Sequence, residues 1–207
     1  MYQRVSVVHF GMDTELKKVA VIAGPSGSGK NALIDTIIRD HPSCARLVTA
    51  TTRAPRPGEH DGMDYHFFSE EVFSAAMDRG DIPEHRFVPA LNTYYGIYLP
   101  DLEDKIQLNT TVFAQVDIIG ARLLKERYAA TTIFMMPASI VEFRNRLRSR
   151  NPEWSEGEFE ERMRITEEEL REHAPQYDYR VVNADGGLGR AVSEVLEILM
   201  REGYILD

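Results

Sequence analysis

The sequence predicts an α/β protein whose central parallel sheet is covered by helices on both faces. Short apolar runs recur at 17–23, 46–50, 110–116, 131–136 and 179–183, and helical patterns lie between several of them. This alternation is typical of parallel sheets, because each crossover places a helix on one face of the sheet. A glycine-rich loop joins the first apolar run to a helical pattern, which is the second observation behind this prediction.

The elements follow from local sequence. The run KKVAVIA at 17–23 indicates a buried strand, GPSGSGKN follows it, and the next apolar residues have helical spacing until Pro42. Further helices are predicted at about 118–128, 139–149, 156–173 and 188–201.

Residues 51–98 interrupt this rhythm. They are rich in proline, glycine, tyrosine and charge, and they predict an inserted lobe of short antiparallel strands with one helix. Ser69 is expected to cap that helix and Gly80 to end it.

Composition limits the class of protein. A chain of 207 residues with 43% hydrophobic and 28% charged residues is expected to form one good core, with room for a smaller lobe. The net charge of -9 argues against nucleic-acid binding and against anionic membranes. Cys44 is the single cysteine, so no internal disulfide is possible, and no signal peptide or membrane span is evident. These features predict a cytoplasmic protein.

The loop GPSGSGKN matches the phosphate-binding pattern G-x-x-x-x-G-K-[ST] except at its last position. Its glycines allow backbone N–H groups to face an anion, its lysine adds a positive charge, and the next helix N-terminus favours negative charge. A purely structural turn is the alternative. The position between strand and helix favours nucleotide phosphate binding by Gly24, Ser26, Gly27, Ser28, Gly29, Lys30 and Asn31.

A second motif is TTRAPRPGEHDGMDYHF at 51–67. Arg53 and Arg56 lie three residues apart on a stretch that two prolines stiffen, so they lose little entropy when they bind a dianion. Tyr65 can add a hydroxyl donor. The alternative is a surface loop with unrelated arginines.

With these motifs in view, the chain resembles the guanylate kinases. The segments GPSGSGK, TATTRAPRPGEHDGMDY, NTYYG, RLRSR and YDYRVVNAD follow the order and approximate spacing of that family over about residues 18–200. The resemblance implies a P-loop NTPase three-layer fold that transfers the γ-phosphoryl of ATP to GMP or dGMP with Mg²⁺. It also implies a core at 18–50 and 99–207, a mixed α+β GMP-binding lobe at about 51–98, a helical lid at about 150–162, and an extension at 1–17.

The resemblance also implies residue roles. Arg53, Arg56, Tyr65 and Tyr95 would hold the GMP phosphate, Thr49 would face guanine O6, and Glu84 and Asp117 would accept from the guanine donors. Lys30, Arg56, Arg150 and Arg162 would be catalytic, because phosphoryl transfer depends on positioning and charge stabilisation. Arg146 and Asn183 would contact adenine. Solvated surface charge is the alternative for Glu84 and Asp117.

Four positions depart from the family pattern. Asn31 replaces the hydroxyl that binds magnesium, although its side-chain oxygen can still reach the ion or a bound water. Ile97 replaces a Ser or Thr at the GMP phosphate, Gln115 replaces an Asp, and Ile119 replaces a Gln. Each change lies near the magnesium or the acceptor.

Three functions therefore stay open at this point. An ATP-dependent GMP kinase is favoured, because the lysine and the arginines are retained. A kinase of another phosphorylated acceptor, such as ribose 1,5-bisphosphate, is the second. A guanylate-kinase-like interaction domain with weak or no catalysis is the third. The expected partners are ATP and GMP, without nucleic acid or membrane, in a monomer or homodimer.

Overall fold

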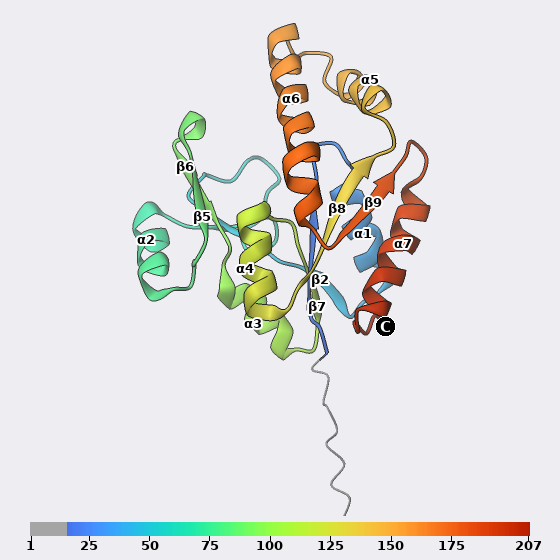
Figure 1. Cartoon of the computed structure of the whole chain (residues 1–207). Coiled ribbons are helices and arrows are strands. Elements are labelled where there is room, and N and C mark those ends of the chain that lie inside the picture. The colour runs from blue at the N-terminus through green and yellow to red at the C-terminus, as the bar shows by residue number, and fades with distance from the viewer. Residues whose placement is uncertain (1–15) are drawn as a thin grey trace, which may run out of the picture.

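The computed structural model describes residues 16–207, so residues 1–15 of the predicted extension lie outside the described residues. A five-stranded sheet forms the centre of the molecule (Figure 1), with strand order β2-β7-β1-β8-β9 and every pair parallel. In that order the strands are Cys44–Arg46, Thr111–Ala114, Val19–Ala23, Thr131–Pro137 and Tyr179–Asn183.

Helices cover both faces of this sheet, as the sequence predicts. The central strand β1 is fully buried and its side chains alternate between the faces. Val19 and Val21 pack with α3 (Leu99–Gln107) and α4 (Ile118–Tyr128). Ala20 and Ile22 pack with α1 (Lys30–Asp40) and α7 (Leu188–Arg201). The predicted α/β class with a parallel sheet is therefore confirmed.

The apolar run at 46–50 differs from its prediction as a single strand. Strand β2 ends at Arg46, and β3 (Ala50–Thr51) belongs to a second sheet. The intervening backbone is held by side chains of α3: Val48 N donates to Asp101 Oδ2 at 2.9 Å, and Lys105 Nζ donates to Arg46 O at 2.8 Å. This segment therefore crosses from one sheet to the other.

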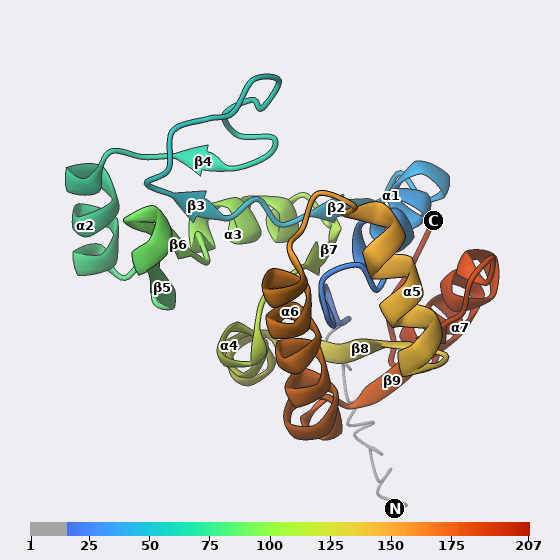
Figure 2. The same cartoon turned by 90° about the horizontal axis from the view of Figure 1, so that it is seen from above.

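The second sheet has the order β4-β3-β6-β5 and lies to one side of the core in Figure 2. Its other strands are β4 (His66–Phe67), β5 (His85–Val88) and β6 (Thr93–Gly96), with a 3₁₀ turn at Pro89–Leu91. Helix α2 (Glu70–Arg79) begins at the predicted cap, where Ser69 Oγ accepts from Val72 N, and it ends at Gly80 with φ 82°. Its small core consists of Ala50, Phe73, Ala76 and Ile82.

Helices α5 (Ile140–Arg150) and α6 (Glu156–Glu168) stand above the sheet in Figure 1 and share a core of Phe143, Leu147, Phe159 and Met163. The helix predicted at 156–173 is α-helical only to Glu168. A π-helical segment, Glu169–His173, and a 3₁₀ turn, Ala174–Gln176, follow it. Among residues 16–207, no helix is both long and apolar enough to cross a membrane.

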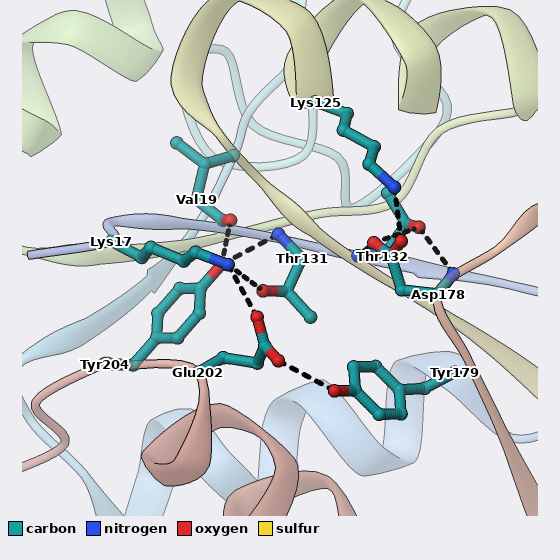
Figure 3. Close-up of polar contacts among 9 residues, drawn as sticks. All are labelled: Lys17, Val19, Lys125, Thr131, Thr132, Asp178, Tyr179, Glu202 and Tyr204. Atoms are coloured by element: carbon teal, nitrogen blue, oxygen red, sulfur yellow. Dashed lines mark hydrogen bonds and ion pairs between the residues drawn. The ribbon is translucent and has the colours of Figure 1, made fainter.

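The C-terminus is tied to the start of the sheet by Tyr204 (Figure 3). Its hydroxyl accepts from Thr131 N at 2.9 Å and donates to Val19 O, so it joins β1 and β8 where their ladder begins. Lys17 Nζ pairs with Glu202 at 2.6 Å, and Glu202 also accepts from Tyr179 Oη at 2.7 Å. This network fixes the end of the sheet opposite the glycine loop.

We expect Tyr204→Phe to lower the free energy of unfolding by about 1–3 kcal/mol, because it leaves two buried backbone groups without a partner. Urea unfolding measures this change. Tyr128→Phe is the matched control, since the Tyr128 hydroxyl bonds an exposed carboxylate, Glu103. That change should stay within about 0.5 kcal/mol. Equal effects of the two substitutions would contradict the role assigned to Tyr204.

Candidate active site

The glycine loop connects the end of β1 to the start of α1. Gly24 has φ 136° and Gly29 has φ 95°, which L side chains rarely adopt. A Cβ at Gly24 would lie 2.6 Å from Met135 O, and one at Gly29 would lie 2.3 Å from Asn183 Nδ2. Neither position has room for a side chain. The loop therefore brings its amides close to the N-terminus of α1, where an anion is favoured.

Lys30 is held by the loop itself. Its ammonium donates to Gly24 O at 2.7 Å and to Pro25 O at 2.9 Å. Burial lowers the pKa of Lys30 to about 8, and the nearby carboxylate of Glu169 opposes that shift. A phosphate dianion at the loop would favour the charged ammonium, so its binding is expected to raise this pKa again.

Asn183 supports the loop from the end of β9. Its Nδ2 donates to Ser28 O at 2.8 Å, and only 6% of the residue is exposed. The hydroxyl of Ser28 is fully buried and has no partner among the described residues, whereas Ser26 is exposed. Direct contact of Asn183 with adenine stays a prediction, and its bond to the loop is an additional role.

One of the predicted lid arginines borders the loop. A cavity of about 300 Å³ is lined by Gly27, Lys30, Asn31, Gln115 and Arg150, so Arg150 lies beside the loop.

Two other predicted arginines, Arg146 and Arg162, contact side chains of the protein itself. Arg146 pairs with Asp185 at 2.9 Å and lies over the Phe143 ring. The guanidinium of Arg162 lies over Trp154, 5.6 Å from the ring centre. Arg162 and Trp154 thus interact within the α5–α6 unit.

The paired arginines of the second motif are braced by a carboxylate. Glu59 accepts from the Arg53 guanidinium at 2.9 Å and from Arg56 N at 2.7 Å. Arg53 also lies over the Tyr65 ring, and Tyr65 contacts Tyr95 edge-on at 5.8 Å between ring centres. These contacts gather Arg53, Tyr65 and Tyr95 in one place and leave the Arg56 side chain exposed.

Between the second sheet and the core lies a pocket of about 240 Å³, which we call the acceptor pocket. Burial, and then the charge of Asp117, raise the pKa of Glu84 to about 7. One oxygen of Asp117 caps α4, where it accepts from Ile119 N at 3.0 Å and from Gly120 N at 3.1 Å. The acceptor pocket is lined by Thr49, Tyr65, Glu84, Arg86, Val88, Tyr95, Gly96, Ile97, Gln115, Val116 and Asp117.

The acceptor pocket and the glycine loop are neighbours. Gln115 lines both the acceptor pocket and the loop cavity. A larger cavity of about 640 Å³ reaches from Gly24 and Lys30 to Asp117. Predicted site residues between Gly24 and Arg150 therefore line neighbouring cavities, although their individual roles stay predictions.

The four departures have different surroundings. Ile97 is buried, and its Cδ1 lies 3.0 Å from where a Cβ at Gly120 would be, so it joins the acceptor pocket to the core. Gln115 Oε1 accepts from Arg46 Nη1 at 3.2 Å, and Arg46 also pairs with Asp35 at 2.8 Å. Asn31 is exposed, and Ile119 is 60% exposed.

The sequence-based prediction missed four residues near the site. Glu59 had a visible signal, since it lies three residues after Arg56 in a rigid loop. Arg86 had one too, because it lies two residues after Glu84, at the spacing that places side chains on the same side of an extended segment. Glu169 stands in a run of glutamates, and only the π-helical segment shows which of them borders the cavity of Lys30. Arg46 had no signal in the sequence.

Comparison with known proteins decides the family. The model of the family described as guanylate kinase matches residues 16–202. The chain belongs to the guanylate kinase family. It is 36% identical over 182 residues to the guanylate kinase of Protochlamydia amoebophila, over 88% of this chain and 89% of that one. It is also 36% identical over 183 residues to the guanylate kinase of Desulfitobacterium hafniense, over 88% of each chain.

A solved structure is similar over nearly the whole length. The crystal structure of guanylate kinase from Anaplasma phagocytophilum has a TM-score of 0.65 and 28% sequence identity, and the match covers 91% of this chain and 87% of that chain. The family and the P-loop NTPase fold that the sequence predicted are therefore confirmed, and the chain is an ATP-dependent kinase of the guanylate kinase family.

We expect the carboxyl of Glu84 to titrate near pH 7 in the free protein, measured by NMR of ¹³C-labelled glutamate. Asp117→Asn should lower this pKa, because it removes a negative charge that disfavours ionised Glu84, while asparagine still caps α4. Glu59 provides an internal control, since its bonds to Arg53 and then Arg56 hold its pKa below the usual range. A Glu84 midpoint near 4.5 in both proteins would contradict the assigned environment.

Proposed function

We propose that this chain transfers the γ-phosphoryl group of ATP to GMP or dGMP and releases ADP and GDP or dGDP. One observation carries the proposal: a pocket with two close carboxylates, Glu84 and Asp117, shares the Gln115 wall with the phosphate loop of Lys30. Guanine presents N–H donors at N1 and at its 2-amino group. Carboxylates in a partly buried pocket are suitable acceptors for those donors.

The roles proposed for individual residues follow from charge. Arg53, Arg56, Tyr65 and Tyr95 bind the GMP phosphate, and Thr49 donates to guanine O6. The loop residues 24–31 bind the phosphates of ATP, with Arg146 and Asn183 toward adenine. An oxygen of the GMP phosphate attacks the γ-phosphorus of ATP. The bond between the γ-phosphorus and the β–γ bridging oxygen breaks, and ADP leaves with that oxygen. Lys30, Arg56, Arg150 and Arg162 stabilise the charge of the transferring group.

We further propose that the segments move as the family pattern suggests. The lobe at about 51–98 carries GMP, and the lid at about 150–162 closes over the loop. Arg162 then leaves Trp154 to reach the phosphates. Closure excludes water and strengthens each charge interaction, which is the usual purpose of a lid.

Mg²⁺ fits this site as an ion held mainly by substrate. Residues 16–207 contain no cluster of three or more acidic, histidine or cysteine side chains that would hold a metal. Mg²⁺ usually keeps several waters and binds through one or two protein groups plus substrate phosphates. The Asn31 oxygen is a suitable ligand of this kind. The ion would neutralise phosphate charge.

The two other functions have less support. A ribose bisphosphate has no N–H donors for Glu84 and Asp117. A non-catalytic interaction domain has no need for Lys30 and the clustered arginines. A monomer or homodimer in the cytoplasm stays our prediction for the state and location of the protein.

An assay of ADP release across GMP, dGMP, AMP, UMP and ribose 1,5-bisphosphate tests the proposed function. We expect turnover with GMP and dGMP, and at least about 100-fold lower kcat/KM with AMP, whose N1 acceptor would face a carboxylate. Preference for ribose 1,5-bisphosphate would establish the second function, and absence of turnover with every acceptor would establish the third.

We expect Asn31→Ser to lower the Mg²⁺ concentration for half-maximal rate. The amide oxygen lies further from the backbone than a hydroxyl, so Asn31 is proposed to bind the ion through water. Gln107→Ser on α3, an exposed amide far from the loop in sequence, is the control and should leave the Mg²⁺ dependence unchanged. An unchanged dependence in Asn31→Ser, or loss of activity, would show that Asn31 has a different role.

A further inference from the structure

Arg86 lies on the face of β5 that lines the acceptor pocket. Side chains alternate along a strand, so Arg86 and Val88 share one face of β5, and they line the pocket together with Glu84, which directly precedes the strand. Arg86 is directly opposite Tyr95 in the antiparallel pair of β5 and β6. Arg86 therefore lies beside the predicted base-binding acid, Glu84, and across the strand pair from Tyr95, and its charge also acts on Glu169.

The register of β5 is fixed from its other face. Phe87 contacts the Tyr94 ring at 4.8 Å, and Tyr94 contacts Phe73 in the core of the second sheet at 5.7 Å. Glu84 O accepts from Ile97 N at 3.1 Å, which continues the pairing. A slip by one residue would turn Phe87 into the pocket and Arg86 into the apolar core. Arg86 thus points away from the apolar core of the second sheet and borders both the acceptor pocket and the 640 Å³ cavity that contains Lys30.

Arg86 also lacks a protein partner. In the described part of the chain its guanidinium forms no ion pair within 4.0 Å, although the carboxylates of Glu84 and Glu169 are close enough to interact with it electrostatically. Most other arginines near the site are held by protein groups, as Arg53 is by Glu59 and Arg146 by Asp185. The exposed Arg86 guanidinium, with its five N–H donors, is therefore available to bind a ligand in the acceptor pocket.

The acceptor pocket offers carboxylate acceptors beside the donors of the Arg86 guanidinium. Glu84 and Asp117 are acceptors, while Ile97 contributes only hydrocarbon at the wall next to them. Guanine carries the matching pattern, with N–H donors at N1 and the 2-amino group and acceptors at O6 and N7. A guanidinium binds O6 and N7 together with good geometry.

We infer that Arg86 is a specificity-determining residue that donates to O6 and N7 of the guanine acceptor, next to Thr49. This inference rests on the proposed function and deepens it. Glu84 and Asp117 read the donor edge of the base, and Arg86 reads its acceptor edge. Adenine would present its 6-amino donor to Arg86, so the same residue acts against AMP.

Substitution by methionine tests this role, because it keeps an unbranched stem and removes every donor. Arg86→Met should lower kcat/KM for GMP roughly 10-fold, in line with the loss of one bidentate pair. The KM for ATP should change less than about 2-fold, and the preference for GMP over AMP should fall. Steady-state kinetics with each substrate varied in turn measures these values.

Modified acceptors locate the contact on the base. 7-Deaza-GMP lacks the N7 acceptor, and 6-thio-GMP replaces O6 with a poor acceptor while N1–H is kept. The effect of Arg86→Met should shrink with both analogues. IMP lacks only the 2-amino group, so the preference for GMP over IMP should be the same in the variant. Arg79→Met is the control for loss of a lobe arginine, since Arg79 pairs with Asp81 instead.

The outcomes separate this inference from the proposed function. Wild-type protein without GMP kinase activity would overturn both. Activity on GMP with equal loss for all analogues in Arg86→Met would overturn this inference alone, because Arg86 would then act away from the base. A larger rise in the KM for ATP than for GMP would also overturn it and would place the action of Arg86 with Glu169, in the 640 Å³ cavity that contains Lys30.

Discussion

The rest of the site depends on the partly buried ammonium of Lys30 and the loop that encloses it. Two carbonyls of the loop accept from this one cation, so the loop folds around a charge that its own sequence supplies. Burial weakens that charge, as the lowered pKa shows, and a phosphate at the loop amides would restore it. The free loop is thus already shaped for an anion, and only glycine fits at positions 24 and 29, where the backbone has positive φ and a side chain would clash with Met135 or Asn183.

Elements around the loop follow from its position at the centre of the sheet. Strand β1 lies between β7 and β8, so the residues after those strands border the loop. Gln115 and Asp117 follow β7 and connect the loop to the acceptor pocket. Asn183 ends β9 and bonds the loop from the other side. Ligands of parallel sheets gather at these carboxyl ends for the same reason.

The two halves of the acceptor site are built with opposite electrostatics. On the phosphate half, Glu59 pairs with the Arg53 guanidinium and accepts from the backbone N of Arg56, which holds Arg53 in place and leaves the Arg56 side chain exposed. On the base half, Glu84 and Asp117 repel one another, and burial makes the ionised form of Glu84 costly. A ligand with a dianion at one end and N–H donors at the other would match the arginines of the first half and the carboxylates of the second. This pattern, together with family membership, favours a guanine nucleotide as the acceptor.

The sequence by itself determined the fold class, the family and the order of the motifs. Strand, glycine loop and helix are local patterns, and the caps Ser69 and Gly80 act within one turn, so neither needs distant contacts. The tertiary structure decided what depends on partners far along the chain. The run at 46–50 divides between two sheets, and a side chain of α3 bonds to its middle. Of three adjacent glutamates, Glu169, at the start of the π-helical segment, lines the cavity of Lys30. Arg46 meets Gln115 only because β2 pairs with β7, and no local signal encodes that pairing.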